Sequence, residues 1–169
     1  MRKTAVLIFF AISLITAEAQ TSRQAQSKVP DDNHAFVLIN QSGYALDIEN
    51  GDKKAGTNVR LWERNDSEAQ KFRIVMAPDG YYYLLNERSG KMLDVSGGKN
   101  NHGDNMQIWY ANSDKAQKFK IIAAGSGFYY LQPYGSDYYV SPQYSNPLKG
   151  TNVILWDKSQ MAKWKFVKR

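Results

Sequence analysis

The sequence has no cysteine, and only two histidines and five prolines among its 169 residues. The absence of cysteine excludes disulfide bonds, thiolate nucleophiles, cysteine-based zinc sites and a cysteine-linked lipid anchor. The two histidines, His34 and His102, have no metal-ligating neighbour at a useful spacing, so we expect neither a metal site nor a cofactor. Stability must therefore come from the burial of apolar side chains, for which a chain of this length is large enough.

Clusters of one charge are also missing. Lys and Arg number 22 against 16 Asp and Glu, which gives a formal net charge of +6. The basic side chains are scattered singly or in pairs, as at Lys53 and Lys54. Because a nucleic-acid interface requires a contiguous basic face, we expect no nucleic-acid partner.

Long hydrophobic runs are limited to one, near the N-terminus. Arg2 and Lys3 precede the apolar run 5–15, and segment 17–19 places small residues where a signal peptidase recognises them. We therefore predict a signal peptide over residues 1–19 and a secreted protein, extracellular or periplasmic. An uncleaved membrane anchor is the alternative, but the run is shorter than the ~20 residues that span a bilayer, so we expect no membrane insertion.

Patterns typical of enzymes are missing as well. The sequence has no nucleophile elbow, no glycine-rich phosphate loop, no histidine-rich metal motif and no Ser/His/Asp set. We therefore expect no catalytic residues and a protein that is not an enzyme.

The sequence does contain a threefold internal repeat. Trp62, Trp109 and Trp156 stand 47 residues apart. Four more triplets of identical residues keep the same interval: Gly56, Gly103 and Gly150; Asn58, Asn105 and Asn152; Lys71, Lys118 and Lys165; Phe72, Phe119 and Phe166. Three such units fill residues 29–169. The polar stretch 20–34 is expected to form a flexible arm.

Each repeat contains four short β-type runs, and these runs coincide between repeats. They are 36–39, 44–48, 58–62 and 70–74 in the first unit, 81–85, 91–95, 105–109 and 117–121 in the second, and 128–131, 138–141, 152–156 and 164–167 in the third. One four-strand unit cannot bury its own apolar face, so the three units must close around a pseudo-threefold axis. The sequence therefore predicts an all-β fold, a β-trefoil over residues 35–169. A β-propeller is the competing fold, but it usually takes four or more blades.

Strand alternation predicts which side chains face outward. Val59 and Leu61 are apolar and point to the core, so Arg60 and Trp62 point outward. The same parity in the run 44–48 turns Asp47 outward. The glycine and asparagine triplets are predicted to be structural, glycine by allowing positive φ and asparagine by bonding turn backbone.

An outward carboxylate and an outward indole thus recur together. Asp47 precedes Trp62, and Asp94 precedes Trp109, by 15 residues each. A pyranose offers C–H patches that lie well on an indole face and paired hydroxyls that a carboxylate accepts through both oxygens. Each pair is therefore predicted to form a shallow sugar-binding pocket, and Gln107 adds a polar contact in the second.

These repeats resemble those of the ricin B-type lectins, whose units carry an Asp, a sugar-stacking aromatic residue and a later Gln-x-Trp motif. The resemblance rests on 93–95, 106–109 and 116–119 in the second unit and covers residues 36–169. It implies a carbohydrate-binding protein, a lectin with QxW repeats. The implied partners are galactose-like or related pyranose sugars, presented as monosaccharide, glycan or polysaccharide.

The resemblance also implies a role for individual residues. Asp94 would accept hydrogen bonds from two sugar hydroxyls, Trp109 would stack on the ring, and Gln107 and Gln117 would add polar contacts or orient the carboxylate. The same roles in the first unit would fall to Asp47, Trp62 and Gln70, with Arg60 in place of the family's Gln.

The family pattern is not followed everywhere. Ala69 and Ala116 stand where a sugar-contacting Asn often precedes the later Gln. In the third unit Ser141 replaces the Asp and Trp164 replaces the Gln, so that pocket is expected to be weak or inactive.

Other interpretations of these residues stay open. The tryptophans would recur by symmetry alone if they only covered the barrel rim, and the aspartates would serve equally well as turn caps. The rival function is a non-sugar interaction module, a protein ligand or protease inhibitor, acting through loops such as 144–149.

Overall fold

The computed structural model describes residues 34–169. The predicted signal peptide and, apart from His34, the predicted arm lie outside the described residues. The strands are β1 (Ala35–Asn40), β2 (Ala45–Ile48), β3 (Val59–Trp62), β4 (Lys71–Met76), β5 (Tyr82–Asn86), β6 (Met92–Val95), β7 (Met106–Trp109), β8 (Phe119–Gly125), β9 (Phe128–Pro133), β10 (Tyr139–Pro142), β11 (Val153–Trp156) and β12 (Trp164–Lys168). Three short 3-10 helices accompany them: η1 (Glu49–Gly51), η2 (Glu68–Gln70) and η3 (Lys115–Gln117). The prediction of four strands in each repeat is confirmed, with bounds that shift by a few residues.

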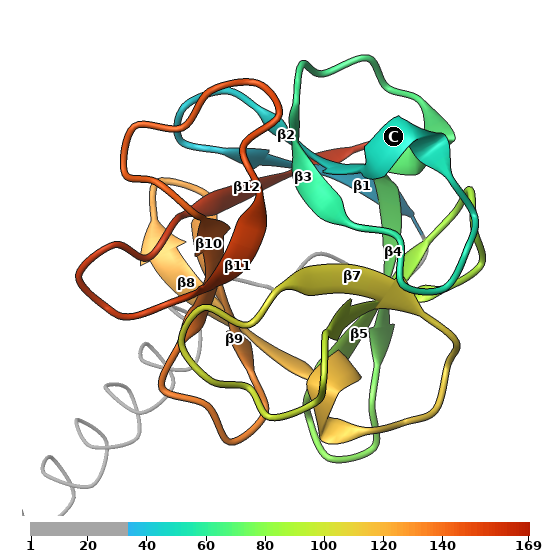
Figure 1. Cartoon of the computed structure of the whole chain (residues 1–169). Helices are drawn as coiled ribbons and strands as arrows, with labels where there is room; N and C mark the ends of the chain where they lie inside the picture. Colours follow the sequence, from blue (N-terminus) through green and yellow to red (C-terminus); the bar gives the residue numbers. More distant parts are fainter. Residues whose placement is uncertain (1–33) are drawn as a thin grey trace, which may run out of the picture.

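Six of the strands form a closed antiparallel barrel. β1 pairs with β4 and β12, β5 pairs with β4 and β8, and β9 pairs with β8 and β12. These pairings return to their starting strand, so the barrel has no free edge that invites association. Figure 1 looks along the barrel, with the three repeats arranged around its axis.

The other six strands form three two-stranded hairpins that cover one end of the barrel. They are β2–β3, β6–β7 and β10–β11. Backbone bridges connect the three hairpins to one another, and β3, β7 and β11 meet around the axis in Figure 1. This arrangement is a β-trefoil, as the sequence predicts.

The glycine triplet connects neighbouring hairpins. Gly56, Gly103 and Gly150 have φ angles of 88°, 84° and 86°, in the left-handed region that favours glycine. Each N–H donates to a strand carbonyl of another repeat at 2.8 Å. The predicted positive φ is confirmed, and the same loops also join the repeats.

The asparagine triplet does not bond turn backbone as predicted. Asn105 Nδ2 donates to Asn58 Oδ1 at 3.0 Å, and Asn152 Nδ2 donates to Asn105 Oδ1 at 2.8 Å. The sequence prediction was wrong because these side chains converge only when the three hairpins meet at the axis. They link the repeats to each other.

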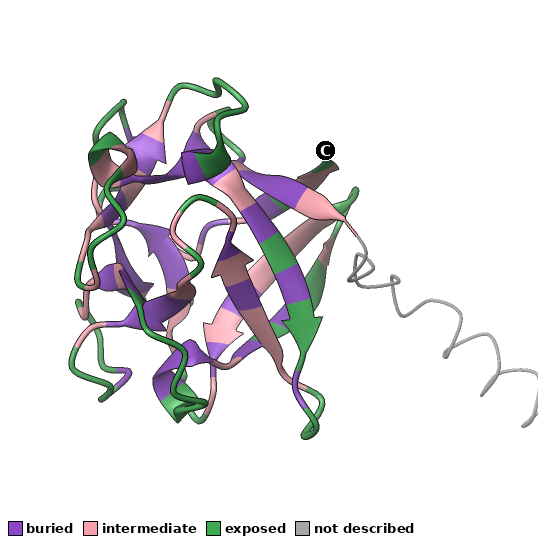
Figure 2. Ribbon diagram, turned by 90° about the vertical axis from the view of Figure 1, so that its right-hand side faces the viewer, coloured by how far each residue is buried: buried purple, intermediate pink, exposed green. Residues whose placement is uncertain are grey.

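The core draws on all three repeats. Phe72, Phe119 and Trp164 are fully buried, and Phe166 packs edge-on against Phe36 with ring centroids 6.1 Å apart. In Figure 2 buried residues are found mainly on the strands, and most of the exposed residues lie on the loops. Burial of this apolar surface, at about 25 cal/mol per Å², is what stabilises a chain without disulfides. Within residues 34–169 no helix has the length and hydrophobicity of a membrane span.

Candidate functional site

Antiparallel pairing brings the predicted aspartate and tryptophan onto one face of each hairpin. In β6–β7, Asp94 lies opposite Gln107 and Met92 lies opposite Trp109. Residues two apart on a strand share a face, so Asp94, Gln107 and Trp109 occupy the same side of the hairpin. The β2–β3 hairpin has the same register, with Asp47 opposite Arg60.

The carboxylate of Asp94 is fixed by two amides. Gln107 Nε2 donates to Oδ1 at 2.7 Å, and Gln117 Nε2 donates to Oδ2 at 3.0 Å. Each carboxylate oxygen has capacity to accept a second hydrogen bond. The side chain is thus oriented in advance, with acceptor capacity left for a ligand.

The aspartates are buried deeper than the sequence predicts. Asp47 is 4% exposed and Asp94 is 5% exposed. Both point to the predicted face of their hairpins, but the expectation that they would be exposed there was wrong. The alternation is correct, but the segments that follow each hairpin, η2 and η3, cover both aspartates. Both carboxylates therefore lie below the surface of their hairpins.

Gln117 acts from beneath the pocket and does not line its surface. It is fully buried, and besides Asp94 its amide nitrogen donates to the Tyr110 carbonyl at 2.9 Å. Its oxygen accepts from the Asn112 N–H at 3.2 Å. Gln117 therefore orients Asp94 and holds the loop after β7 in place. Gln70 makes the equivalent contacts to Asp47 and to the Glu63 carbonyl.

Burial changes the acidity of both carboxyl groups. It raises the pKa of Asp94 above its ordinary value, and the hydrogen bonds from Gln107 and Gln117 oppose the rise. Burial likewise raises the pKa of Asp47, against the bonds from Gln70 and Arg60. Desolvation disfavours the charged form of a carboxyl group, so both groups bind protons more readily than a free aspartate.

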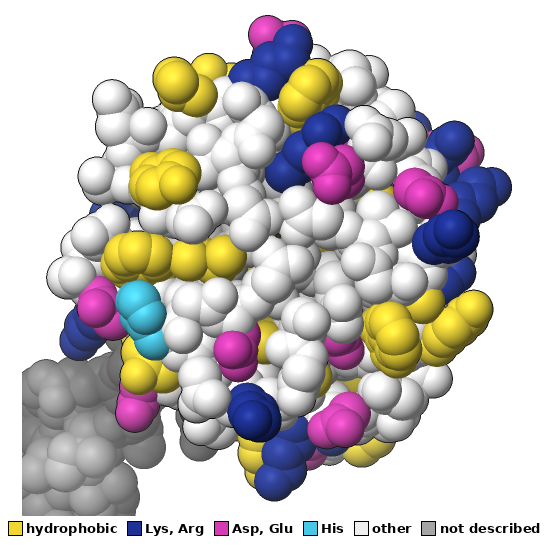
Figure 3. Space-filling view, in the orientation of Figure 1, with side chains coloured by type: hydrophobic (Ala, Val, Ile, Leu, Met, Phe, Trp, Pro, Cys, Tyr) yellow, Lys and Arg dark blue, Asp and Glu magenta, His cyan; other side chains and the backbone are white. Residues whose placement is uncertain are grey.

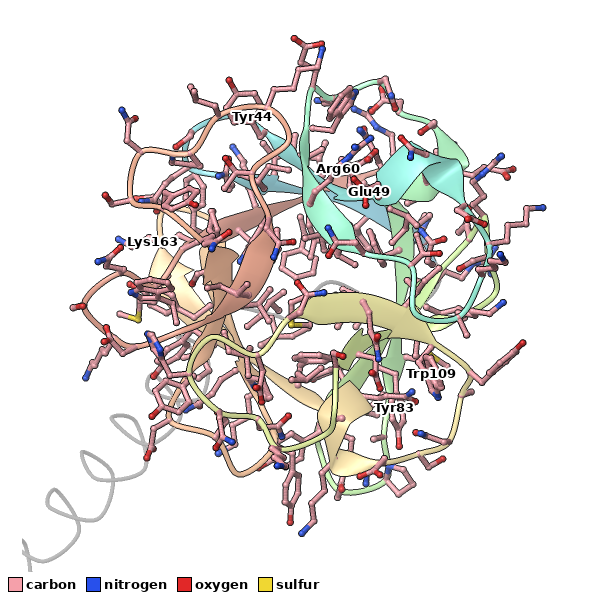
Figure 4. The ribbon with its side chains drawn as sticks, in the orientation of Figure 1. Tyr44, Glu49, Arg60, Tyr83, Trp109 and Lys163 are labelled. Atoms are coloured by element: carbon pink, nitrogen blue, oxygen red, sulfur yellow. The ribbon has the colours of Figure 1, made fainter. Side chains whose placement is uncertain are left out.

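Trp109 presents the most open indole of the triplet. It is 38% exposed, whereas Trp62 and Trp156 are less exposed. Tyr110 stands beside it at a centroid separation of 6.2 Å, with an exposed ring that Lys91 Nζ approaches to 4.9 Å. Figure 3 shows apolar side chains on the surface at the right, where Figure 4 places Trp109 at the end of β7.

In the first repeat a guanidinium lies where the second repeat has an amide. Arg60 Nε donates to Asp47 Oδ1 at 3.4 Å, and Nη1 donates to Glu49 Oε1 at 3.1 Å. Its Cζ also lies 4.0 Å from the centroid of Trp62. Figure 4 shows Arg60 on β3 beside Glu49 of η1. The predicted residues do come together, but one face of Trp62 is already covered by a cation.

A cavity of about 290 Å³ adjoins this group. Asp47, Arg60 and Trp62 line one part, and Asn50 and Arg88 line another. Sequence reasoning missed Arg88 because it belongs to the turn between β5 and β6, in the next repeat. An alignment of the three repeats does indicate Arg88, because the corresponding residues, Gln41 and Gly135, are uncharged.

The third hairpin, β10–β11, has neither the aspartate nor the glutamine that holds it, because Ser141 and Trp164 stand at these positions. The Ser141 hydroxyl accepts from the Ala162 N–H at 2.9 Å, and Trp164 Nε1 donates to the Val140 carbonyl. His102 lies over Trp156, with ring centroids 4.7 Å apart. Neither a carboxylate nor an open indole is therefore offered by this hairpin.

Metal-ligating side chains do not gather in the part of the chain that the structure describes: no group of three His, Cys, Asp or Glu residues is placed to hold an ion. The Asp, Gln and Trp side chains of these hairpins offer hydrogen bonds and an aromatic face.

Comparison with known proteins agrees with this architecture. The model of the family described as ricin-type β-trefoil lectin domain-like matches residues 25–109 and 68–156. The designed threefold-symmetric protein ThreeFoil is 30% identical, with a TM-score of 0.74 over 79% of this chain and 97% of its own. No curated protein sequence matches.

Two natural proteins with the same fold share less sequence with this chain. The Macrolepiota procera ricin B-like lectin, solved in complex with lactose, is 14% identical with a TM-score of 0.70, covering 84% of this chain and 100% of its own. An exo-β-1,3-galactanase from Clostridium thermocellum is 24% identical with a TM-score of 0.77, covering 83% of this chain. This chain spans only 31% of the galactanase.

The chain is thus a β-trefoil that carries an Asp, a Gln and a Trp on one face of its second hairpin. Since the family model matches well over half of the residues, the chain belongs to the ricin-type β-trefoil lectin domain-like family.

Proposed function

We propose that this protein is a lectin that binds a galactose-like or related pyranose in the pocket of the second repeat. The observation that carries the proposal is the exposed Trp109 indole beside a carboxylate, Asp94, that two glutamines hold in place. The indole offers a face to the C–H patch of the ring, and the carboxylate accepts hydrogen bonds from adjacent hydroxyls. Gln107 lies between them and contributes a further polar contact.

The binding is expected to be weak at a single site. The Trp109 indole lies open at the surface, so we expect a Kd of about 0.1–1 mM, which corresponds to roughly −4 to −5.5 kcal/mol. Useful strength would then come from repeated sugar units on a glycan or polysaccharide, which raise the local ligand concentration.

The family and its members support carbohydrate as the partner. The Macrolepiota procera lectin, of the same fold, was solved with lactose, a galactose-containing sugar. The leader-like segment 1–19 supports export, to the periplasm or the cell exterior, where such polymers are found. The proposal includes no catalysis, since Asp47 and Asp94 belong to different hairpins and a glycosidase needs two carboxyl groups facing one bond.

The first test is an NMR titration that follows the indole N–H signals of the four tryptophans. Galactose, N-acetylgalactosamine, xylose and lactose form the panel. We expect the Trp109 signal to move with at least one sugar. Trp164 serves as an internal reference, because it is fully buried and bonded to the Val140 carbonyl.

A matched pair of variants locates the site. Asp94→Ala should abolish the Trp109 response while the far-ultraviolet circular dichroism of the domain is retained. Asp47→Ala removes the equivalent carboxylate of the other hairpin and should leave the Trp109 response intact. Equal binding by Asp94→Ala and wild type would refute the proposal. An unmoved Trp109 combined with protein binding that depends on Tyr144 would favour the rival interaction module.

A further inference from the structure

The two hairpins that carry an aspartate differ in charge where they face a ligand. Arg60 of the first corresponds to Gln107 of the second, and Arg88 corresponds to Gly135, each 47 residues apart. Both arginines line the same cavity of about 290 Å³. The first pocket therefore has two guanidinium groups at positions where the second has none.

The contacts of these arginines leave donors free. Arg60 uses three of its five N–H groups, on Asp47, Glu49 and Asn50. Arg88 Nε donates to the Gly51 carbonyl, which anchors the side chain across the cavity rim. Within residues 34–169, Arg88 has no carboxylate partner, so its positive charge is not offset by an ion pair.

The same contacts disfavour a neutral sugar. The Arg60 guanidinium lies 4.0 Å from the Trp62 ring centroid, and Lys149 Nζ lies 4.5 Å from it. These cations take up the ring surface on which an uncharged pyranose would stack, and Arg60 also occupies one oxygen of Asp47. A sugar that displaced the two cations from the ring would break their cation–π contacts with Trp62 and their ion pairs with neighbouring carboxylates.

We propose that the pocket of the first repeat binds a sugar that carries an anionic group, a carboxylate or a sulfate ester, held between Arg60 and Arg88. Guanidinium groups bind such oxyanions through paired, charge-assisted hydrogen bonds. Asn50, which accepts from Arg60 through its amide oxygen, also lines the cavity. The inference rests on the proposed function, because it takes both hairpins as sugar sites. It assigns acidic sugars to the first pocket and neutral sugars to the second.

The test compares sugars that differ only in the anionic group. Galactose, galacturonic acid and galactose 6-sulfate are titrated into the protein while the Trp62 and Trp109 indole signals are followed. We expect both acidic sugars, or one of them, to shift Trp62, and galactose to shift Trp109 alone. Comparing the Trp62 shift with galacturonic acid and with galactose 6-sulfate identifies which of the two anionic groups the arginines bind.

Variants assign the effect to the two arginines. Arg60→Gln and Arg88→Gly each install the residue that stands at the corresponding position of the second pocket, Gln107 or Gly135. Each should weaken the binding of the acidic sugar at Trp62 by roughly tenfold. Arg73→Gln is the charge-matched control, because Arg73, on β4, pairs with Glu87 and does not line the cavity. It should leave the Trp62 response as in wild type.

The outcomes separate this inference from the proposed function. Galactose shifting Trp62 as strongly as the acids, acids that leave Trp62 unmoved, or an acid response that survives both arginine variants would each overturn the inference. A Trp109 signal that ignores every sugar contradicts the proposed function, whatever Trp62 does.

Discussion

Asp94 is almost completely buried, and under the proposed function it also has to accept hydrogen bonds from a ligand. Burial raises its pKa, while Gln107 and Gln117 favour the charged form and limit the rise. The ionised carboxylate is the form that accepts from two hydroxyls, because a protonated carboxyl group loses one acceptor position. The protonation state of Asp94 should therefore decide whether the proposed pocket binds a sugar.

As the pH is lowered, Asp94 should therefore be protonated before an ordinary aspartate, whose pKa is ~3.9. Sugar binding at Trp109 should be lost at that higher pH. For a carboxyl group with a raised folded pKa, the favourable effect on folding is present below the unfolded pKa and lost as the pH rises through the folded one. Protonation of Asp94 thus removes binding without unfolding the domain. Titrations between pH 3.5 and 7, with circular dichroism at each pH, should show binding lost before structure. Constant affinity down to pH 4 would contradict this.

At the scale of the element, the short segments after each hairpin decide how the pocket is held. η3 ends with Gln117, which is fully buried and reaches Asp94, Tyr110 and the N–H of Asn112. Gln107, on β7, is partly exposed and bonds Asp94 alone. The two amides share a carboxylate, but only Gln117 also supports the loop.

Gln117→Ala should therefore lower the free energy of unfolding by about 1–3 kcal/mol, because it removes one hydrogen bond from the buried Asp94 carboxylate and two from the loop after β7. Gln107→Ala should cost less stability while still weakening sugar binding. Urea denaturation of both variants measures the difference. If Gln107→Ala proved the more destabilising of the two, the assignment of Gln117 as the structural amide would be wrong.

At the scale of the whole molecule, the barrel exists only when all three repeats contribute strands. β12 of the last repeat pairs with β1 of the first, with Phe36 opposite Lys168 and Asn40 opposite Trp164. Loss of one repeat would open the barrel and expose its core. Stability is thus shared among units that are alike in sequence.

We expect a single cooperative unfolding transition as a result. Tryptophan fluorescence, which reports mostly on the hairpins, and far-ultraviolet circular dichroism, which reports on all strands, should give the same denaturation midpoint. Two separated midpoints would show that the hairpins melt independently of the barrel.

Particular residues show how far the sequence alone could reach. The identical triplets at 47-residue spacing predict the strands and their threefold closure, because local alternation and period suffice for both. The pairing of Asp94 with Gln107 also follows from alternation. The burial of Asp47 and Asp94 does not, since η2 and η3 come from farther along the chain to cover them. Arg88 was missed for the same reason, being placed by the packing of one repeat against the next.

The position of the chain ends has a practical consequence. The Arg169 N–H donates to the Ala35 carbonyl at 2.8 Å, so the domain begins and ends at one place. The pockets lie on the hairpins at the opposite end of the barrel, away from the C-terminus marked at the right in Figure 2. A tether attached at either end, or a host loop into which the domain is grafted, would therefore leave both pockets pointing away from the support.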